Sequence, residues 1–152
     1  MDRKKILVYG YGNPGRGDDG LGPALVGRIE SEGIPGVDTD SNYQLNIEDS
    51  LALSSYETVI FADASLDGEG AFSFTPLEPS MNISFTTHAM DPGSVLALCE
   101  ELYGKRVRAF MLAIRGFCWD FHEGLSTNAE ENLEAALIDV RAKIRGLQSG
   151  FL

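Results

Sequence analysis

The chain has 152 residues, and its 12 Lys and Arg against 23 Asp and Glu give a formal net charge of −11 with both histidines neutral. This length and 43% hydrophobic residues are those of one folded domain over residues 1–152, which excludes collagen-like, coiled-coil and disordered chains. The acidic balance argues against nucleic acid and anionic membranes as partners, because a surface that neutralises phosphates needs an excess of Lys and Arg.

Apolar runs alternate with helical patterns along the chain. The runs at 6–9, 58–62 and 109–114 predict buried strands, residues 37–40 predict a weaker strand, and a short edge strand is expected within 67–82. Three apolar stripes with helical spacing fall between or after these strands: Leu21, Ala24, Leu25 and Ile29; Val95, Leu98, Cys99 and Leu102; and Leu133, Leu137, Val140, Ile144 and Leu147. A further short helix is expected within 46–53.

Start signals precede two of these helices. Asp91 followed by Pro92 predicts a capping side chain and a proline at the first helical position, and Thr127 with Glu130 fits a capping box. The alternation predicts a three-layer α/β fold of the phosphorylase/hydrolase-like kind, with a twisted, mostly parallel sheet of about five strands between helices. In such sheets the active crevice lies outside the carboxyl ends of the strands, so residues just past each strand are the candidates for chemistry.

The glycine-rich segment after the first strand allows a nucleotide site to be considered. Residues 10–15 contain G-x-G-x-x-G, but Pro14 and Gly17 delay the following helix, and Asp18 and Asp19 place negative charge where a phosphate would bind. A nucleotide site is therefore the weaker interpretation.

Three residues past strand ends are candidate metal ligands. For Asp18 a stabilising interaction with the helix dipole is the better interpretation, whereas Asp19 is flanked by Gly20 and Gly22, which would leave its carboxylate open at the crevice. Asp63 follows the run 58–62 directly, where capping a turn and facing a ligand are equally expected, and His88 precedes the helix that starts at Pro92. Two oxygen donors and one nitrogen donor suit Zn²⁺, Ni²⁺ or Fe²⁺ better than Mg²⁺ or Ca²⁺.

Two other segments carry weaker signals. Cys118 and His122 have Cys-x-x-x-His spacing but no partner pair, so we interpret them as loop and strand-end residues. Residues 43–45 are interpreted as a surface loop, with a substrate groove as the alternative. Only four apolar residues, 6–9, precede Gly10, too few for a signal peptide or membrane span, and the two cysteines make no disulfide framework, so a cytoplasmic protein is expected.

The motifs together resemble those of the nickel-iron hydrogenase maturation endopeptidases. The resemblance rests on residues 6–14, on Gly-Asp-Asp-Gly-Leu-Gly at 17–22, on Phe-Ala-Asp-Ala at 61–64 and on His88, and it extends to about Leu137. Position by position, the family's metal-contacting acid falls on Asp19, its strand-end aspartate on Asp63 and its histidine on His88.

The resemblance implies an endopeptidase that removes the C-terminal extension of a hydrogenase large-subunit precursor after nickel insertion. The metal would be a divalent ion, nickel supplied by the precursor, recognised by Asp19, Asp63 and His88, with either carboxylate as the general base. We expect a monomer whose partner is that precursor. A non-catalytic metal-sensing assembly chaperone and, less favoured, a nucleotide-binding α/β enzyme are the alternatives.

Overall fold

The computed structural model describes residues 5–81 and 90–152, so the candidate ligand His88 lies outside the described residues. The described chain forms a five-stranded sheet in the order β2-β1-β3-β5-β4, in which only β4 is antiparallel to its neighbour. The strands are β1 (Ile6–Tyr11), β2 (Val37–Asn42), β3 (Thr58–Ser65), β4 (Phe72–Leu77) and β5 (Arg108–Arg115). The predicted three-layer α/β fold with a mostly parallel sheet is confirmed.

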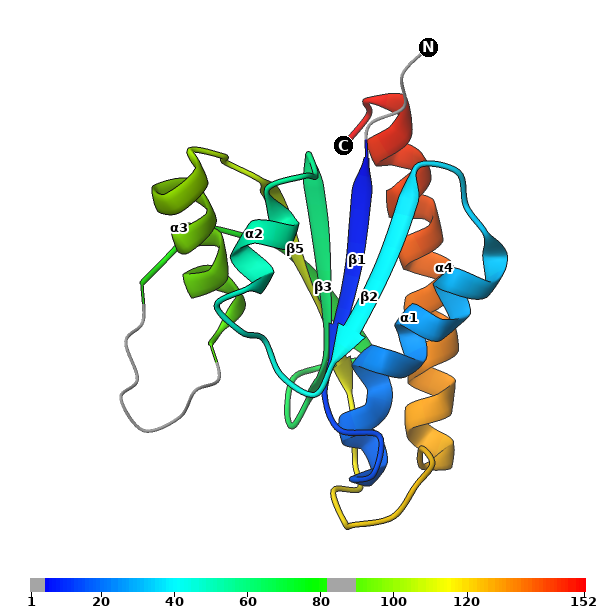
Figure 1. The fold of residues 1–152 in the computed structure, drawn as a ribbon. Coiled ribbons are helices and arrows are strands. Elements are labelled where there is room, and N and C mark those ends of the chain that lie inside the picture. The colour runs from blue at the N-terminus through cyan, green and yellow to red at the C-terminus, as the bar shows by residue number, and fades with distance from the viewer. Residues whose placement is uncertain (1–4, 82–89) are drawn as a thin grey trace.

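Helices cover both faces of this sheet (Figure 1). Helices α1 (Leu21–Glu32) and α4 (Thr127–Ser149) lie on one face, and α2 (Asp49–Leu53) and α3 (Pro92–Tyr103) lie on the other. A short 3-10 helix, η1 (Gly17–Gly20), precedes α1. Because successive side chains of a strand point to opposite faces, the central strands supply both cores.

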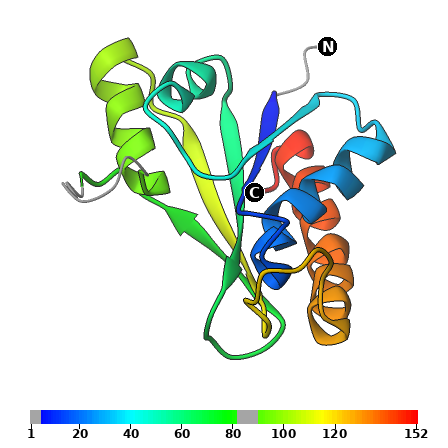
Figure 2. The same ribbon diagram turned by 60° about the horizontal axis from the view of Figure 1, so that its bottom comes forward.

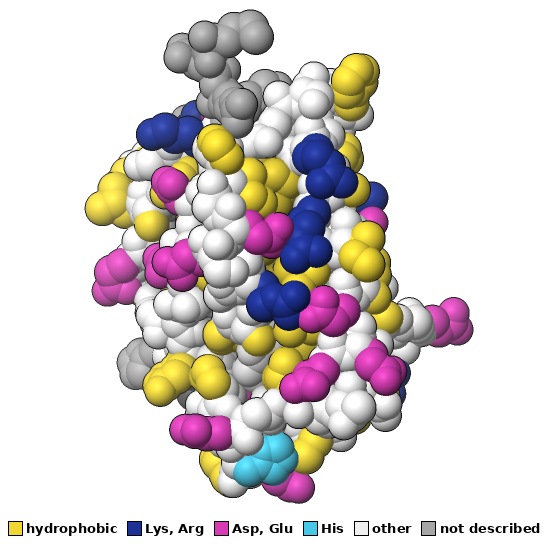
Figure 3. Space-filling view, turned by 90° about the vertical axis from the view of Figure 1, so that its right-hand side faces the viewer, with side chains coloured by type: hydrophobic (Ala, Val, Ile, Leu, Met, Phe, Trp, Pro, Cys, Tyr) yellow, Lys and Arg dark blue, Asp and Glu magenta, His cyan; other side chains and the backbone are white. Residues whose placement is uncertain are grey.

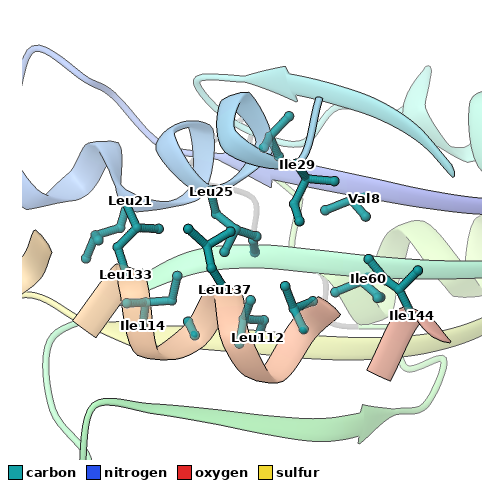
Figure 4. Close-up of a cluster of buried hydrophobic side chains, with 14 of the residues drawn as sticks. Val8, Leu21, Leu25, Ile29, Ile60, Leu112, Ile114, Leu133, Leu137 and Ile144 are labelled. Atoms are coloured by element: carbon teal, nitrogen blue, oxygen red, sulfur yellow. The ribbon is translucent and has the colours of Figure 1, made fainter. Parts of the chain in front are cut away.

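The larger core lies between the sheet and the helices α1 and α4. Figure 4 shows side chains of α1, such as Leu21 and Leu25, beside Leu133 and Leu137 of α4, with the side chains of the strands, such as Ile60, packed against both. The apolar stripes predicted for these two helices are confirmed, since every Leu, Ile and Val residue of the two stripes is at most 5% exposed. Burial of this size holds the first turn of α1 firmly against the ends of β1 and β3.

A second core lies between the other face of the sheet and the helices α2 and α3, and the buried face of α3 differs from the predicted stripe. Val95 and Cys99 of α3 are buried as expected, but the face toward the sheet also includes Leu96, whereas Leu102 is 56% exposed. The buried face therefore turns toward Leu96, and the last turn of α3 extends past the sheet.

Side-chain caps start α3 and α4. Asp91 accepts a hydrogen bond from Ser94 N at 2.7 Å with Pro92 as the first helical residue, so the predicted cap is confirmed. The predicted capping box at Thr127 is wrong by one position, because the cap is Ser126, whose Oγ accepts from Ala129 N at 3.2 Å. Thr127 is the first helical residue.

Charged side chains of both signs mix on the face formed by α1 and α4 (Figure 3). Arg28 and Glu134 form an exposed ion pair between the two helices, and Arg141 Nε lies 2.8 Å from Glu32 Oε1. Exposed pairs of this kind contribute only about 0–1 kcal/mol each, so the two helices are held mainly by their apolar faces. Within residues 5–81 and 90–152, no helix has the length and apolar character needed to span a membrane.

Candidate functional site

The candidate site is built from the segments that follow β1, β3 and β5 at one edge of the sheet. Figure 2 brings this edge forward and shows the segment after β1 beside the one after β5. Backbone hydrogen bonds join them, from Gly17 N to His122 O and from Asp18 N to Cys118 O, both at 2.8 Å. The turn before α1 is therefore fixed by a segment about 100 residues away in sequence.

The turn after β1 holds the Asp19 carboxylate in place. Gly12 has a φ of +141°, and a Cβ there would lie 2.0 Å from Asp19 O, so only glycine fits. The next residue, Asn13, donates its backbone N–H to Asp19 Oδ2 at 2.8 Å and accepts at its own Oδ1 from Gly15 N. The Asp19 side chain is half-buried, and this hydrogen bond from Asn13 ties it to the glycine-rich loop.

Asp18 has a structural role that the sequence did not reveal. Its carboxylate is fully buried and accepts four hydrogen bonds of 2.7–2.9 Å, from the backbone N–H groups of Phe117, Cys118 and Ser126 and from the Ser126 hydroxyl. Burial alone would raise the pKa of Asp18, but these donors lower it below its ordinary value. Asp18 lies in the first turn of η1, where an interaction with the helix dipole stays a prediction, and it also links this turn to the segment after β5.

The glycines beside Asp19 serve packing. A Cβ on Gly22 would lie 2.5 Å from Ala62 O and 2.6 Å from Tyr11 O, so this glycine lets the start of α1 approach β1 and β3. A Cβ on Gly20 would lie 2.9 Å from the Cα of Pro14. Both glycines thus have a packing role, and the expectation that they leave the Asp19 carboxylate open stays a prediction. Their close contacts bring the turn with Asp19 next to the end of β3.

Asp63 lies within β3, opposite Ala113 of β5, one position beyond the last pair between β1 and β3. The strand is thus longer than the predicted run, and Asp63 is half-buried at its edge. One carboxylate oxygen accepts from Ala64 N at 2.8 Å, and the Tyr11 side chain hydrogen-bonds the same carboxylate.

The two carboxylates interact electrostatically. Burial is the main cause that raises the pKa of Asp63 to about 7, and the negative charge of Asp19 raises it further, against the opposing hydrogen bonds. Burial and the Asp63 charge also raise the pKa of the Tyr11 hydroxyl, which therefore stays protonated as a donor. Asp19 and Asp63 are therefore electrostatically coupled, and their shared contact with a metal ion stays a prediction.

Tyr11 is a site residue that sequence reasoning missed. The register pairs Gly10 with Ala62, so Tyr11 and Asp63 are the next residues along two neighbouring strands. The sequence did contain a signal for this contact. If the predicted strands 6–9 and 58–62 are parallel neighbours, the residues near their carboxyl ends, Tyr11 and Asp63, lie close together. It could not be used without the strand order, which the sequence alone did not supply.

Met90 and Asp91, which directly precede α3, approach the same edge. Met90 N donates to Leu45 O at 3.2 Å, and the charge of Asp91 contributes to the raised pKa of Tyr11. Within the described residues, no three His, Cys, Asp or Glu side chains form a cluster able to hold a metal ion. Asp19 and Asp63 are therefore a two-carboxylate pair in the described part of the chain, and the third predicted ligand is outside it.

Large apolar side chains are exposed on the segments that follow the strands. Tyr43 and Ile47 after β2, Leu66 after β3, and Phe117 and Phe121 after β5 are between 47% and 83% exposed. The prediction that residues 43–45 form a surface loop holds for Tyr43 but not for Leu45, which is 1% exposed. These exposed side chains lie at the same end of the parallel strands as Asp19 and Asp63.

The sequence and the fold were compared with those of known proteins, and only the fold has clear matches. No family model matches the sequence, and no curated protein is significantly similar to it. The hydrogenase maturating endopeptidase HybD from E. coli superposes with a TM-score of 0.74 at 20% identity, over 93% of this chain and 92% of that chain. The [NiFe] hydrogenase maturation protease HycI from Thermococcus kodakarensis gives a TM-score of 0.71 at 21% identity, over 95% and 94%.

The chain has the fold of the hydrogenase maturation endopeptidases. A third structure, the hydrogenase 2 maturation peptidase from a Thaumarchaeota archaeon, agrees, with a TM-score of 0.67 at 24% identity over 95% of this chain and 99% of that one. The resemblance indicated by the sequence motifs is confirmed in three dimensions across nearly the whole chain.

Proposed function

We propose that this protein is an endopeptidase that removes the C-terminal extension of a nickel-iron hydrogenase large-subunit precursor after nickel insertion. The observation that carries the proposal is the pair of coupled carboxylates, Asp19 and Asp63, at the carboxyl edge of a sheet shared with hydrogenase maturation endopeptidases. The precursor is the partner, and the chain acts on it as a cytoplasmic monomer.

The carboxylate pair fits a divalent cation. Asp63 has a pKa of about 7, because its ionised form is poorly solvated and is repelled by Asp19. A cation between the two carboxylates relieves that repulsion and favours the ionised form of Asp63. The nickel belongs to the precursor in this proposal, so a precursor without nickel is bound weakly and is not cut.

His88 is proposed as the nitrogen ligand of the same ion. Two sequence neighbours support this, because Met90 pairs with Leu45 and Asp91 acts electrostatically on Tyr11, the residue that hydrogen-bonds Asp63. Two carboxylates and one imidazole leave positions on the ion for the precursor's own ligands.

The peptide bond is cleaved by water with carboxylate assistance. Either Asp19 or Asp63 is the general base in this proposal, because the pKa of about 7 belongs to the metal-free Asp63 and bound nickel would lower it. Tyr11 and the Ala64 N–H both interact with the Asp63 carboxylate and help to orient it. The exposed apolar side chains after β2, β3 and β5 bind the precursor around the cleaved bond.

The test is incubation with a cognate precursor, loaded with nickel or free of it, followed by mass spectrometry. The proposal requires one cut in the loaded precursor, none in the nickel-free precursor, and no cut by Asp19→Asn or Asp63→Asn. Binding of the loaded precursor without any cut would instead support the metal-sensing chaperone. Thermal stabilisation by NAD(P), with none by Ni²⁺, would favour a nucleotide enzyme.

A further inference from the structure

A cysteine and a histidine that the proposed function does not use lie in contact on the segment between β5 and α4. Cys118 Sγ is 3.3 Å from His122 Nε2, within hydrogen-bonding distance for sulfur, and 3.9 Å from Asp120 Oδ2. Cys118 is partly exposed and His122 is exposed, so both are open to small molecules from solvent. The interpretation of these residues as loop residues is confirmed, and the structure in addition brings their side chains together.

The backbone holds this pair in position before any ligand arrives. Cys118 N donates to the buried Asp18 carboxylate at 2.9 Å, and Cys118 O accepts from Asp18 N at 2.8 Å. His122 O accepts from Gly17 N at 2.8 Å, and His122 N donates to Asp120 O at 2.9 Å. A nucleophile and a base fixed at hydrogen-bonding distance by the surrounding chain are the elements of an activated thiol.

We propose that Cys118 is a reactive thiol, activated by His122, that exchanges with small-molecule disulfides. His122 takes the thiol proton, Cys118 Sγ attacks one sulfur of the disulfide, and a new S–S bond forms as the old one breaks. The departing thiolate carries away the electron pair of the broken bond. The product is a mixed disulfide on the segment that hydrogen-bonds the turn carrying Asp19.

The other cysteine is a built-in control. Cys99 is a residue of α3 buried in the second core, and burial raises the pKa of its thiol. A buried neutral thiol is inert toward disulfides until the protein unfolds. Any fast reaction of the native protein is therefore assigned to one position.

The test is the rate at which native protein reacts with 5,5′-dithiobis(2-nitrobenzoate) near neutral pH, with the modified cysteine identified by mass spectrometry of peptides. We expect Cys118 to react about tenfold faster than the thiols of the same chain unfolded in urea, and Cys99 not to react before unfolding. Cys118→Ser should remove the fast reaction. A native Cys118 that reacts no faster than the unfolded thiols overturns the proposal without any variant being needed.

Two neighbouring substitutions separate the role of the base from simple exposure. His122→Gln should slow the reaction of Cys118 about tenfold, because the group that accepts the proton is lost. Asp120→Asn should not slow it, because a carboxylate beside the sulfur opposes the thiolate. Equal rates in wild type and His122→Gln, with the folded state checked by circular dichroism, would contradict the activation. Neither measurement depends on the proposed protease activity.

Discussion

Asp18 and Asp19 are adjacent in sequence, but the structure gives their carboxylates different surroundings. Asp18 is fully buried and accepts four hydrogen bonds from the segment after β5, whereas the half-buried Asp19 accepts one from Asn13 N. The first carboxylate stabilises the turn, and the second belongs to the candidate site. The two roles can be separated by the same substitution at neighbouring positions.

Asp18→Asn should lower the free energy of unfolding by about 2–3 kcal/mol, because its amide group would face N–H donors that need an acceptor. Asp19→Asn should change it by less than about 1 kcal/mol while abolishing precursor processing. The folded pKa of Asp18 is lowered, so its stabilisation is present at neutral pH and is lost as the pH falls through the acid range below the ordinary value. Urea unfolding near neutral pH checks both variants, and equal losses of stability would contradict the assignment.

The contribution of Asp63 to stability should depend on pH in the opposite direction. Its pKa rises from about 4 in the unfolded chain to about 7 in the folded one, so the folded state binds the proton more tightly. The contribution of Asp63 to stability is therefore most favourable at low pH and is lost as the pH rises through this interval. Asp63→Asn should unfold at higher urea concentration than wild type at about pH 8, with little difference at about pH 4. A difference between the two proteins that does not change with pH would count against the raised pKa.

At the scale of elements, the start of α4 depends on one hydroxyl with two partners. Ser126 Oγ donates to Asp18 Oδ2 at 2.7 Å and accepts from Ala129 N at 3.2 Å, so it caps the helix and joins it to η1. Thr127, the next residue, is exposed and is the first residue of the helix.

Ser126→Ala should therefore lower the free energy of unfolding by about 1–2 kcal/mol, through loss of the cap and of one donor to Asp18. The matched variant Thr127→Ala should change it by less than about 0.5 kcal/mol, because its position is exposed and alanine favours a helix. Thermal or urea unfolding of the two variants distinguishes the capping residue, and a larger loss for Thr127→Ala would restore the capping box that the sequence suggested.

The elements themselves were largely predictable from the sequence, whereas their connections were not. Continuous apolar runs predict buried strands, and periodic apolar residues predict helices. The apolar stripe from Leu133 to Leu147 is an example, because these residues are buried in α4. The hydrogen-bond donors to Asp18 lie within residues 117–126, about 100 positions away in sequence. No local sequence pattern predicts this contact. Tyr11 beside Asp63 likewise depends on strand order. The choice of Asp19 and Asp63 remains a prediction, which the electrostatic coupling between them supports.

At the scale of the whole molecule, the net charge of −11 has a consequence for stability. An excess of carboxylates repels itself in the folded state, and salt weakens this repulsion more than it weakens the few exposed ion pairs such as Arg28 with Glu134. Raising NaCl to about 0.5 M, where charges are screened beyond about 4 Å, should raise the melting temperature. A decrease, measured by calorimetry at constant pH, would show that attractive pairs dominate.

The whole fold brings the carboxyl ends of parallel strands to one edge, where Asp63 of β3 is electrostatically coupled to Asp19 after β1 and the following segments expose large apolar side chains. The central claim is that these carboxylates act on a nickel-loaded hydrogenase precursor. The most direct measurement is mass spectrometry of that precursor after incubation with wild type and with Asp19→Asn, beside a nickel-free sample. We expect a single shortened product with wild type and nickel only. An uncut loaded precursor, or equal cutting by the variant, would contradict the claim.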